Sequence, residues 1–276
     1  MVLSAGYFGF FGHAGFVDGL LASGLVPVAY AGTSAGGLVG SMYATGMKSA
    51  DVGALLTGLK RQDFWDPDPL GLALDAVRGG QRPTGLLRGN RFRALLERHL
   101  PVKTFEDCAT PAMVVCTDLT TQSARVIASG DLASAIHATC AYPGMFQAVR
   151  RDGALLWDGG LVDKAPALAL IDYLGASEID VLLVHYLPSR DAITEPTGAL
   201  AYVSAMTTGM AALRKDHFRL QLQVLKARGV EVHVVTSMLP KVSPKLLQHG
   251  SVALAAGRQA AIAALAAPSG EFTVFD

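Results

Sequence analysis

Short apolar runs alternate with stretches of helical periodicity along most of the chain. Apolar or β-branched runs with few charges predict buried strands at residues 2–4, 26–31, 112–117, 125–128, 155–157, 179–186 and 230–236. Apolar residues at helical spacing predict helices at residues 11–23, 37–45, 49–59, 90–100, 134–140 and 252–267. The Pro-rich segment 61–69 is expected to be an irregular loop, and Asp152-Gly153 a hairpin turn.

Strands that alternate with helices are typical of a mostly parallel sheet whose two faces are both covered by helices. The sequence contains no internal repeat, no low-complexity segment and no convincing linker. We therefore expect one α/β domain over residues 1–276, with a three-layer α/β/α arrangement around a mostly parallel central sheet.

Composition narrows the class of protein. Hydrophobic residues make up 51% of the chain and charged residues only 17%, so a large core is easily supplied. The 23 basic and 23 acidic residues balance and form no long run of one sign, which argues against a nucleic-acid partner. The three cysteines lie in apolar surroundings without metal-ligand spacing, and we expect free thiols and no metal site.

The uncharged segment 20–47 is long enough to raise the question of a membrane span. Its many glycines and Pro27 favour a buried strand, turn and helix instead. The first residues lack the basic start and cleavage-site pattern of a signal peptide. These observations predict a cytoplasmic location, with peripheral contact to a membrane left open.

The pentapeptide Gly32-Thr33-Ser34-Ala35-Gly36 stands between a predicted strand and a predicted helix. This order is the context of a nucleophile elbow, in which a sharp turn exposes a serine hydroxyl. The flanking glycines tolerate strained backbone angles, and the following helix directs its N-terminal N–H groups at developing negative charge. Ser34 is therefore the candidate nucleophile, although glycine and serine also meet in many ordinary loops.

A second chemical feature is Asp158-Gly159-Gly160, which follows the apolar run 155–157. An aspartate held at a strand end by a glycine turn can act as a base toward a neighbouring hydroxyl when burial adjusts its pKa. Taken alone, the same tripeptide is better explained as a plain turn.

A third feature is the glycine-rich segment between the first predicted strand and the first predicted helix, with Gly6, Gly9 and Gly12. Successive N–H groups in such a loop can bind a phosphate or an oxyanion. The spacing Gly-x-x-Gly-x-x-Gly differs from the dinucleotide-binding fingerprint, and no acidic residue follows a second strand at the expected distance. We therefore expect no nucleotide and no other cofactor.

Taken together, these segments resemble the patatin-like phospholipases. The resemblance covers residues 1 to about 170 and is carried by the segments 31–40 (AGTSAGGLVG), 84–90 (TGLLRGN), 115–119 (VCTDL), 135–146 (AIHATCAYPGMF) and 157–166 (WDGGLVDKAP). Residues 190–276 are less familiar and are expected to include lipid-facing helices.

The resemblance implies a lipid acyl hydrolase with a Ser-Asp dyad and no metal. Ser34 matches the nucleophile of the family and Asp158 its base. The oxyanion would be held by N–H groups of Gly6, Gly9 and Ala35. The remaining motif glycines are Gly12, Gly32, Gly36, Gly159 and Gly160.

The glycine-rich loop departs from the family pattern in two ways. It has no basic residue before its last glycine, and its glycines are spaced Gly-x-x-Gly-x-x-Gly rather than Gly-x-Gly-x-x-Gly. One lost oxyanion donor lowers a rate by about 100-fold or more. A catalytically weak or silent lipid-binding protein is therefore the alternative. A Ser-His-Asp triad would need a histidine late in the chain, and the sequence offers His185, His217, His233 and His249.

The substrate is less well defined by the sequence. Four phenylalanines are candidates to line an acyl channel: Phe8, Phe10, Phe11 and Phe146. Residues 202–228 predict a basic amphipathic helix, which would either rest on an anionic lipid surface or simply cover the sheet. The expected partner is a lipid or phospholipid substrate, with head group, acyl position and oligomeric state undetermined.

Overall fold

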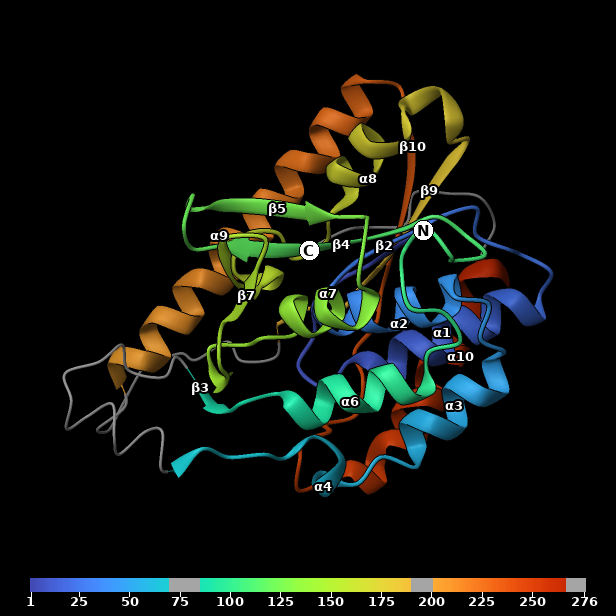
Figure 1. Ribbon diagram of the computed structural model, residues 1–276. Coiled ribbons are helices and arrows are strands. Elements are labelled where there is room, and N and C mark those ends of the chain that lie inside the picture. Colours follow the sequence, from blue (N-terminus) through green and yellow to red (C-terminus); the bar gives the residue numbers. More distant parts are fainter. Residues whose placement is uncertain (70–84, 190–200, 267–276) are drawn as a thin grey trace.

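The computed structural model describes residues 1–69, 85–189 and 201–266. At its centre is an eight-stranded mixed sheet in the order β10-β9-β1-β2-β4-β8-β7, with β5 paired to β4 (Figure 1). The parallel strands are β1 (Val2–Leu3), β2 (Tyr30–Thr33), β4 (Ala112–Asp118), β9 (Val181–Tyr186) and β10 (Glu231–Thr236). The antiparallel additions are β5 (Ser123–Ile127), β7 (Val149–Arg151) and β8 (Ala154–Asp158).

Helices cover both faces of this sheet, so the three-layer α/β/α expectation is confirmed (Figure 1). One layer contains α1 (Phe10–Ala22), α2 (Ala35–Ala44), α3 (Ser49–Thr57), α6 (Asn90–His99), α7 (Leu132–Thr139) and α10 (Gly250–Ala266). The other contains α8 (Ala167–Leu174) and α9 (Ala201–Ala227). The short helix α4 (Arg61–Phe64) and a two-stranded sheet of β3 (Gly85–Leu87) and β6 (Gly144–Phe146) complete the first side.

The central strands are buried on both faces because their alternate side chains enter two different cores. Val2 of β1 and Val115 of β4 belong to the core under α8 and α9, whereas Leu3 and Val114 belong to the core under the larger helical layer. This period of two is why these strands appear as continuous apolar runs in the sequence.

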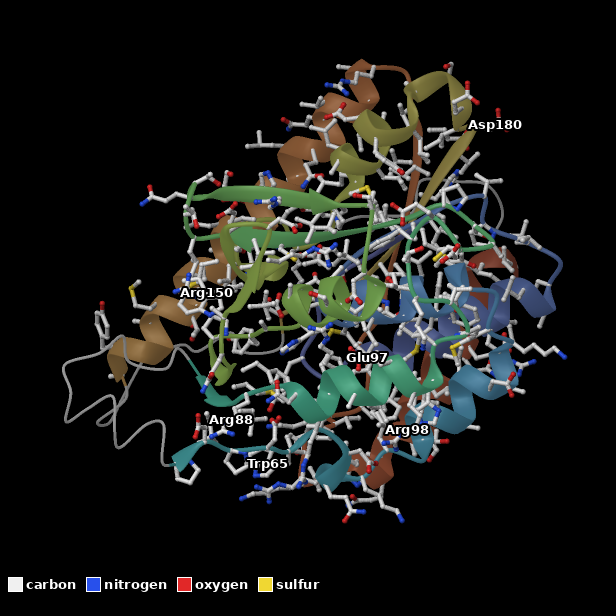
Figure 2. All side chains as sticks on the ribbon, viewed as in Figure 1. Trp65, Arg88, Glu97, Arg98, Arg150 and Asp180 are labelled. Atoms are coloured by element: carbon white, nitrogen blue, oxygen red, sulfur yellow. The ribbon has the colours of Figure 1, made fainter. Side chains whose placement is uncertain are left out.

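The helix α6 has the opposite character, with one buried and one solvated face. Phe92 and Leu96 are buried, while Glu97 and Arg98 lie on the outer surface of the molecule (Figure 2). Its periodic pattern predicted both the helix and its buried face.

Close approach of α1 and α10 depends on glycine. A Cβ atom at Gly15 would lie 1.8 Å from the carbonyl oxygen of Leu254, and one at Gly257 would lie 2.0 Å from that of Gly12. The two helices therefore touch along their backbones, which draws the last described helix against the first. The predicted helix 252–267 is confirmed and begins two residues earlier than expected.

Three expectations about local structure need correction. The second strand begins at Tyr30 rather than residue 26, because Pro27 lacks a ladder donor and Val26 and Val28 are 73% and 70% exposed. The loop 61–69 includes the helical turn α4. The helix expected at residues 37–45 begins at Ala35, directly after Ser34.

The hairpin at Asp152-Gly153 is confirmed. Both residues have positive φ angles, 48° and 76°, as a two-residue turn between β7 and β8 requires.

The chain order along the parallel strands reverses at β1. From β1 the sheet continues through β2 and β4 on one side, and through β9 and β10 on the other. In open α/β sheets, ligands bind outside the carboxyl ends of the strands at such a switch point. The glycine-rich loop follows β1, Ser34 follows β2, and residues 187–189 follow β9 at this same edge.

Candidate active site

Ser34 occupies the turn between β2 and α2 with φ 55° and ψ −122°. Positive φ is unfavourable for a residue with a side chain, and such strain persists only where the surroundings enforce it. Tight packing of the turn holds Ser34 in this backbone conformation. A Cβ atom at Gly36 would lie 2.0 Å from the carbonyl oxygen of Leu3, so only glycine lets α2 start this close to β1.

Hydrogen bonds fix the Ser34 backbone. Its N–H donates to Oγ1 of Thr139 over 3.0 Å, and that hydroxyl donates onward to the carbonyl of Val115. The thiol of Cys140 donates to the Ser34 carbonyl over 3.3 Å. The last turn of α7 therefore holds the strained residue against β4.

Asp158 ends β8 and is almost completely buried, with 3% of its surface exposed. Its Oδ1 accepts the N–H of Gly160 over 2.7 Å. Its own N–H donates to the carbonyl of Ala141 over 3.0 Å, and its carbonyl accepts the hydroxyl of Thr117 over 2.8 Å. The carboxyl group is therefore held in one orientation.

Sheet register brings Ser34 and Asp158 to the same level on opposite sides of β4. Thr33 pairs with Val115, so Ser34 is level with the next residue, Cys116, and Cys116 itself pairs with Asp158. The Ser34 hydroxyl lies close enough to the Asp158 carboxyl group to lower the pKa of that group. Ser34 and Asp158, which are 124 positions apart in the sequence (158 minus 34), therefore lie close together in the fold.

Burial raises the pKa of Asp158 to about 6, from an ordinary value of 3.8. The hydrogen bonds from Ser34 and Gly160 and the positive charge of Arg214 oppose this rise. A carboxyl group with this pKa is mostly ionised at neutral pH and is a stronger base than an exposed aspartate.

The glycine-rich loop between β1 and α1 is folded on itself. The N–H of Gly9 donates to the carbonyl of Gly6 over 2.9 Å, and Phe8 between them has φ 50°. The Gly9 N–H is therefore already paired in this structure. Ala35, by contrast, is the first residue of α2, and N–H groups in the first turn of a helix have no partner within it.

A buried polar chain behind this loop was not anticipated from the sequence. Nε2 of His13 lies 2.8 Å from the carbonyl of Ser4, Nδ1 of His13 lies 2.9 Å from Nδ1 of His185, and Nε2 of His185 lies 2.9 Å from the hydroxyl of Ser237. Phe16 stacks on the ring of His185 at 3.9 Å.

The tautomers of His13 and His185 follow from the Ser4 carbonyl, which can only accept a hydrogen bond. The Ser4 carbonyl requires a proton on Nε2 of His13, so neutral His13 accepts at Nδ1 from Nδ1–H of His185. Neutral His185 then accepts from Ser237. Burial lowers the pKa of His13 to about 4 and that of His185 well below its ordinary value, which keeps both rings neutral.

The late histidines considered for a triad have partners other than the candidate pair. Both ring nitrogens of His185 are used as described above. His233 pairs with Glu231 at 2.6 Å, His217 lies 3.4 Å from Gln221, and His249 lies 3.3 Å from the carbonyl of Lys241.

The four phenylalanines proposed for a channel divide into two groups. Phe8 contacts Phe10 and Phe64 next to the glycine-rich loop, and Phe11 is fully buried beside Phe10. Phe146 is separate and packs against Phe92 and His137.

Two of the hollows in the described part of the chain are lined neither by the candidate pair nor by these four rings. An apolar cavity of about 10 Å³ lies between α2, α3 and α6, and an open hollow of about 480 Å³ lies near Gly46 and His99. The acyl channel therefore stays a prediction.

The sequence was compared with known proteins. The family model of the patatin-like phospholipases matches residues 1–171, well over half of the chain. The chain belongs to this family. All the motifs that indicated the family in the sequence lie within the matched region.

Similar members of the patatin-like phospholipase family are much longer proteins. A Mycobacterium bovis protein, "Uncharacterized NTE family protein Mb2594", is 28% identical over 270 residues, which is 92% of this chain and 44% of the relative. A Caenorhabditis elegans protein, "Putative patatin-like phospholipase domain-containing protein M110.7", is 31% identical over 170 residues, 60% of this chain and 15% of the relative. The chain thus spans less than half the length of these relatives.

A solved structure of VipD from Legionella pneumophila aligns with 95% of this chain and 66% of its own length, with a TM-score of 0.47 and 14% identity. Among residues 1–69, 85–189 and 201–266, no helix combines the length and apolar character that a membrane crossing requires. Within those same ranges, no three histidine, cysteine or acidic side chains cluster as metal ligands.

Proposed function

We propose that this patatin-like protein hydrolyses carboxylic esters of lipids through an acyl-serine intermediate, with Ser34 as nucleophile and Asp158 as base. The observation that carries the proposal is the sheet register that brings Ser34 level with Asp158, a buried carboxyl group whose pKa is raised to about 6. A serine hydroxyl needs such an adjacent base to become nucleophilic.

In the first half-reaction, Oγ of Ser34 attacks the ester carbonyl carbon while Asp158 takes the hydroxyl proton. The tetrahedral intermediate then collapses, the bond to the alcohol breaks, and Asp158 returns the proton to the leaving alkoxide. In the second half-reaction, Asp158 takes a proton from water as the water attacks the acyl-serine. The carboxylic acid is released and Ser34 regains its proton.

The oxyanion in both steps would be stabilised by the first N–H of α2, at Ala35, together with the glycine-rich loop. The positive end of the helix dipole supports a negative charge there. Gly6 is the loop donor that we retain, because the Gly9 N–H is paired with the Gly6 carbonyl in this structure. The proposal requires neither a metal nor a cofactor.

The proposed substrates are lipid esters, and contact with a membrane surface would bring the site to them. Several apolar side chains on α9 are exposed, including Met206, Leu213 and Leu220 at 50%, 72% and 58%. Lys215 and Arg219 lie among them and are exposed as well. This combination supports peripheral binding to an anionic lipid surface. The free state of the described cysteines supports the expected cytoplasmic, reducing location.

A lipid-binding protein without catalysis is the second candidate, and one observation favours it. The Gly9 N–H is turned into the loop, which leaves fewer donors for an oxyanion. Catalysis with one donor fewer would be slower by about 100-fold or more.

Fluorophosphonate labelling distinguishes the two candidates. We expect rapid labelling of the wild-type protein at Ser34, located by peptide mass spectrometry, and none in Ser34→Ala. Asp158→Asn should label slowly, and Asp216→Asn, an exposed acid on α9, should label like wild type. Folded wild-type protein that resists the reagent would contradict the enzyme proposal and favour lipid binding alone.

A further inference from the structure

Lys164 is a buried cation without an acidic partner. Only 5% of its surface is exposed. Its ammonium donates to the hydroxyl of Ser189 over 3.1 Å and lies 4.7 Å from the ring centroid of Tyr186. Among the described residues it forms no ion pair within 4 Å. The carboxylate of the preceding residue, Asp163, accepts the side chain of Gln221 over 2.9 Å. A buried ammonium without an anion is unfavourable.

A second cation lies in the same region. Arg214 reaches from α9 to the turn η1 (Gly159–Leu161), where it donates to the carbonyl of Gly160 over 2.9 Å. It is half-buried and forms no ion pair with a described carboxylate within 4 Å. The Gly160 that Arg214 contacts donates its own N–H to Asp158 over 2.7 Å, and Phe218, one helical turn after Arg214, stacks on the Tyr186 ring beside the Lys164 ammonium. The positive charge of Arg214 lowers the pKa of both Asp158 and Lys164.

These cations lie beside the proposed reaction centre. The backbone carbonyl of Lys164 accepts the N–H of Ala5, the residue that opens the glycine-rich loop, over 2.7 Å. Ser189 follows β9, on the other side of β1 from Ser34. The pair thus lies at the same switch point of the sheet, where an anionic group near the scissile ester would be found.

We propose that Lys164 and Arg214, together with the Ser189 hydroxyl, form a subsite for a phosphodiester group of the substrate lipid. The inference rests on the proposed function and narrows its substrate to esters that carry a phosphate close to the scissile carbonyl. A phosphodiester has one negative charge and two free oxygens. One oxygen can accept from the ammonium and the other from the guanidinium, in charge-assisted hydrogen bonds.

The electrostatics of the two cations agree with this role. Burial, and next the charge of Arg214, lower the pKa of Lys164 to about 7. An anion between the two cations would relieve both their mutual repulsion and the desolvation of the ammonium. The three groups come from different elements, which gives the subsite a fixed shape before ligand binds.

The first test measures the ratio of kcat/KM for two substrates with the same acyl chains, a phosphatidylcholine and a diacylglycerol, in neutral detergent micelles. We expect wild type to favour the phospholipid by about 10-fold or more, as charge-assisted hydrogen bonds of this kind allow. Lys164→Gln and Arg214→Gln should each lower that ratio by about tenfold. Lys226→Gln, an exposed cation on the same helix, is the matched control and should leave the ratio unchanged.

The second test does not depend on hydrolysis. Calorimetry on Ser34→Ala measures binding of glycerophosphocholine, a soluble phosphodiester without acyl chains, and of inorganic phosphate. We expect glycerophosphocholine to bind and Lys164→Gln in the same background to weaken it at least tenfold. Lys164→Met, which keeps the apolar stem of the side chain, replaces the glutamine variant if thermal unfolding shows that the latter has lost its fold.

The outcomes separate the two proposals. Binding of glycerophosphocholine without any ester hydrolysis would support the subsite and overturn the dyad. Hydrolysis with equal preference for both lipids, and no phosphodiester binding, would overturn the subsite alone. Binding of inorganic phosphate but not of glycerophosphocholine would assign the pair to a free phosphate ion and overturn the lipid form of the proposal.

Discussion

The backbone N–H of Ser34 donates to the hydroxyl of Thr139 over 3.0 Å, although the two residues are 105 positions apart in the sequence. Thr139 donates in turn to the carbonyl of Val115. A single hydroxyl therefore joins the strained turn after β2, the end of α7 and the central strand β4. This link sets where the Ser34 side chain lies relative to Asp158.

Replacing Thr139 with valine should leave the Ser34 N–H and the Val115 carbonyl without that partner. We expect the free energy of unfolding to fall by about 1–3 kcal/mol, and kcat to fall further than KM changes. Thr139→Ser retains the hydroxyl and should lose much less of both. Urea unfolding and ester kinetics measure the difference. Equal behaviour of the two variants would show that the hydroxyl does not position Ser34.

The proposed base predicts the acid limb of the pH–rate profile. Asp158 acts as a base only when ionised, and its pKa is raised to about 6 by burial. With an uncharged ester, kcat/KM should be constant above pH 7 and should decrease about tenfold per pH unit well below 6. A limb centred near pH 4 would indicate an exposed carboxylate instead, and a limb that persists in Asp158→Asn would exclude this residue as the base.

Asp158 should also reduce stability at neutral pH. Its folded pKa is raised, so its stabilising contribution is present below pH 3.8 and is lost as the pH rises through about 6. Asp158→Asn should therefore raise the free energy of unfolding at pH 7.5 by about 2–3 kcal/mol. The gain should vanish near pH 4, where the folded aspartate is protonated. Thermal unfolding at both pH values measures this, and a destabilised variant at pH 7.5 would contradict it.

Buried neutral histidines predict acid sensitivity. Burial lowers the pKa of His13 and of His137 to about 4, so each ring binds a proton on unfolding between pH 6.5 and 4. Stability should decrease as the pH falls through this window. His137 contacts Phe92 and Phe146, and its Nε2 has no partner among the described residues. His137→Leu should thus reduce the slope of unfolding free energy against pH by about 1.4 kcal/mol per unit.

Two glycines should respond in opposite ways to alanine. At Gly36 the new Cβ would lie 2.0 Å from the Leu3 carbonyl oxygen, so Gly36→Ala should fail to fold or lose several kcal/mol. At Gly209, in exposed α9, the new Cβ would meet nothing within 4 Å. Gly209→Ala should therefore stabilise the protein by about 1 kcal/mol, through helix propensity. Chemical unfolding of both variants provides the comparison.

Local sequence patterns predicted most helices and strands, because the signals for these elements lie in residues that are close together in the sequence. The buried strands, the Asp152-Gly153 hairpin and the turn at Ser34 all follow from periodicity and glycine placement. The pairing of Ser34 with Asp158 came from family resemblance, since the register through Cys116 is a relationship between three strands that no local pattern contains.

Other parts of the site were missed for the same reason. His13 and His185 are 172 positions apart, and each appeared as an isolated residue in an apolar stretch. The burial of Lys164 could not be predicted, because its contacts with Tyr186 and Ser189 come from a distant part of the sequence. The start of β2 was misplaced because Val26 and Val28 were interpreted as core residues, and the structure leaves them exposed.

The backbone contact between α1 and α10 has a consequence for biosynthesis. His13 hydrogen-bonds to His185, which in turn hydrogen-bonds to the hydroxyl of Ser237. Gly12 and Gly15 pack against the helix that begins at Gly250. A nascent chain that has emerged only as far as residue 171 contains every motif of the family match but lacks these partners. The catalytic apparatus should therefore mature late, after most of the chain has left the ribosome, and a ribosome-bound fragment would need protection from aggregation until then.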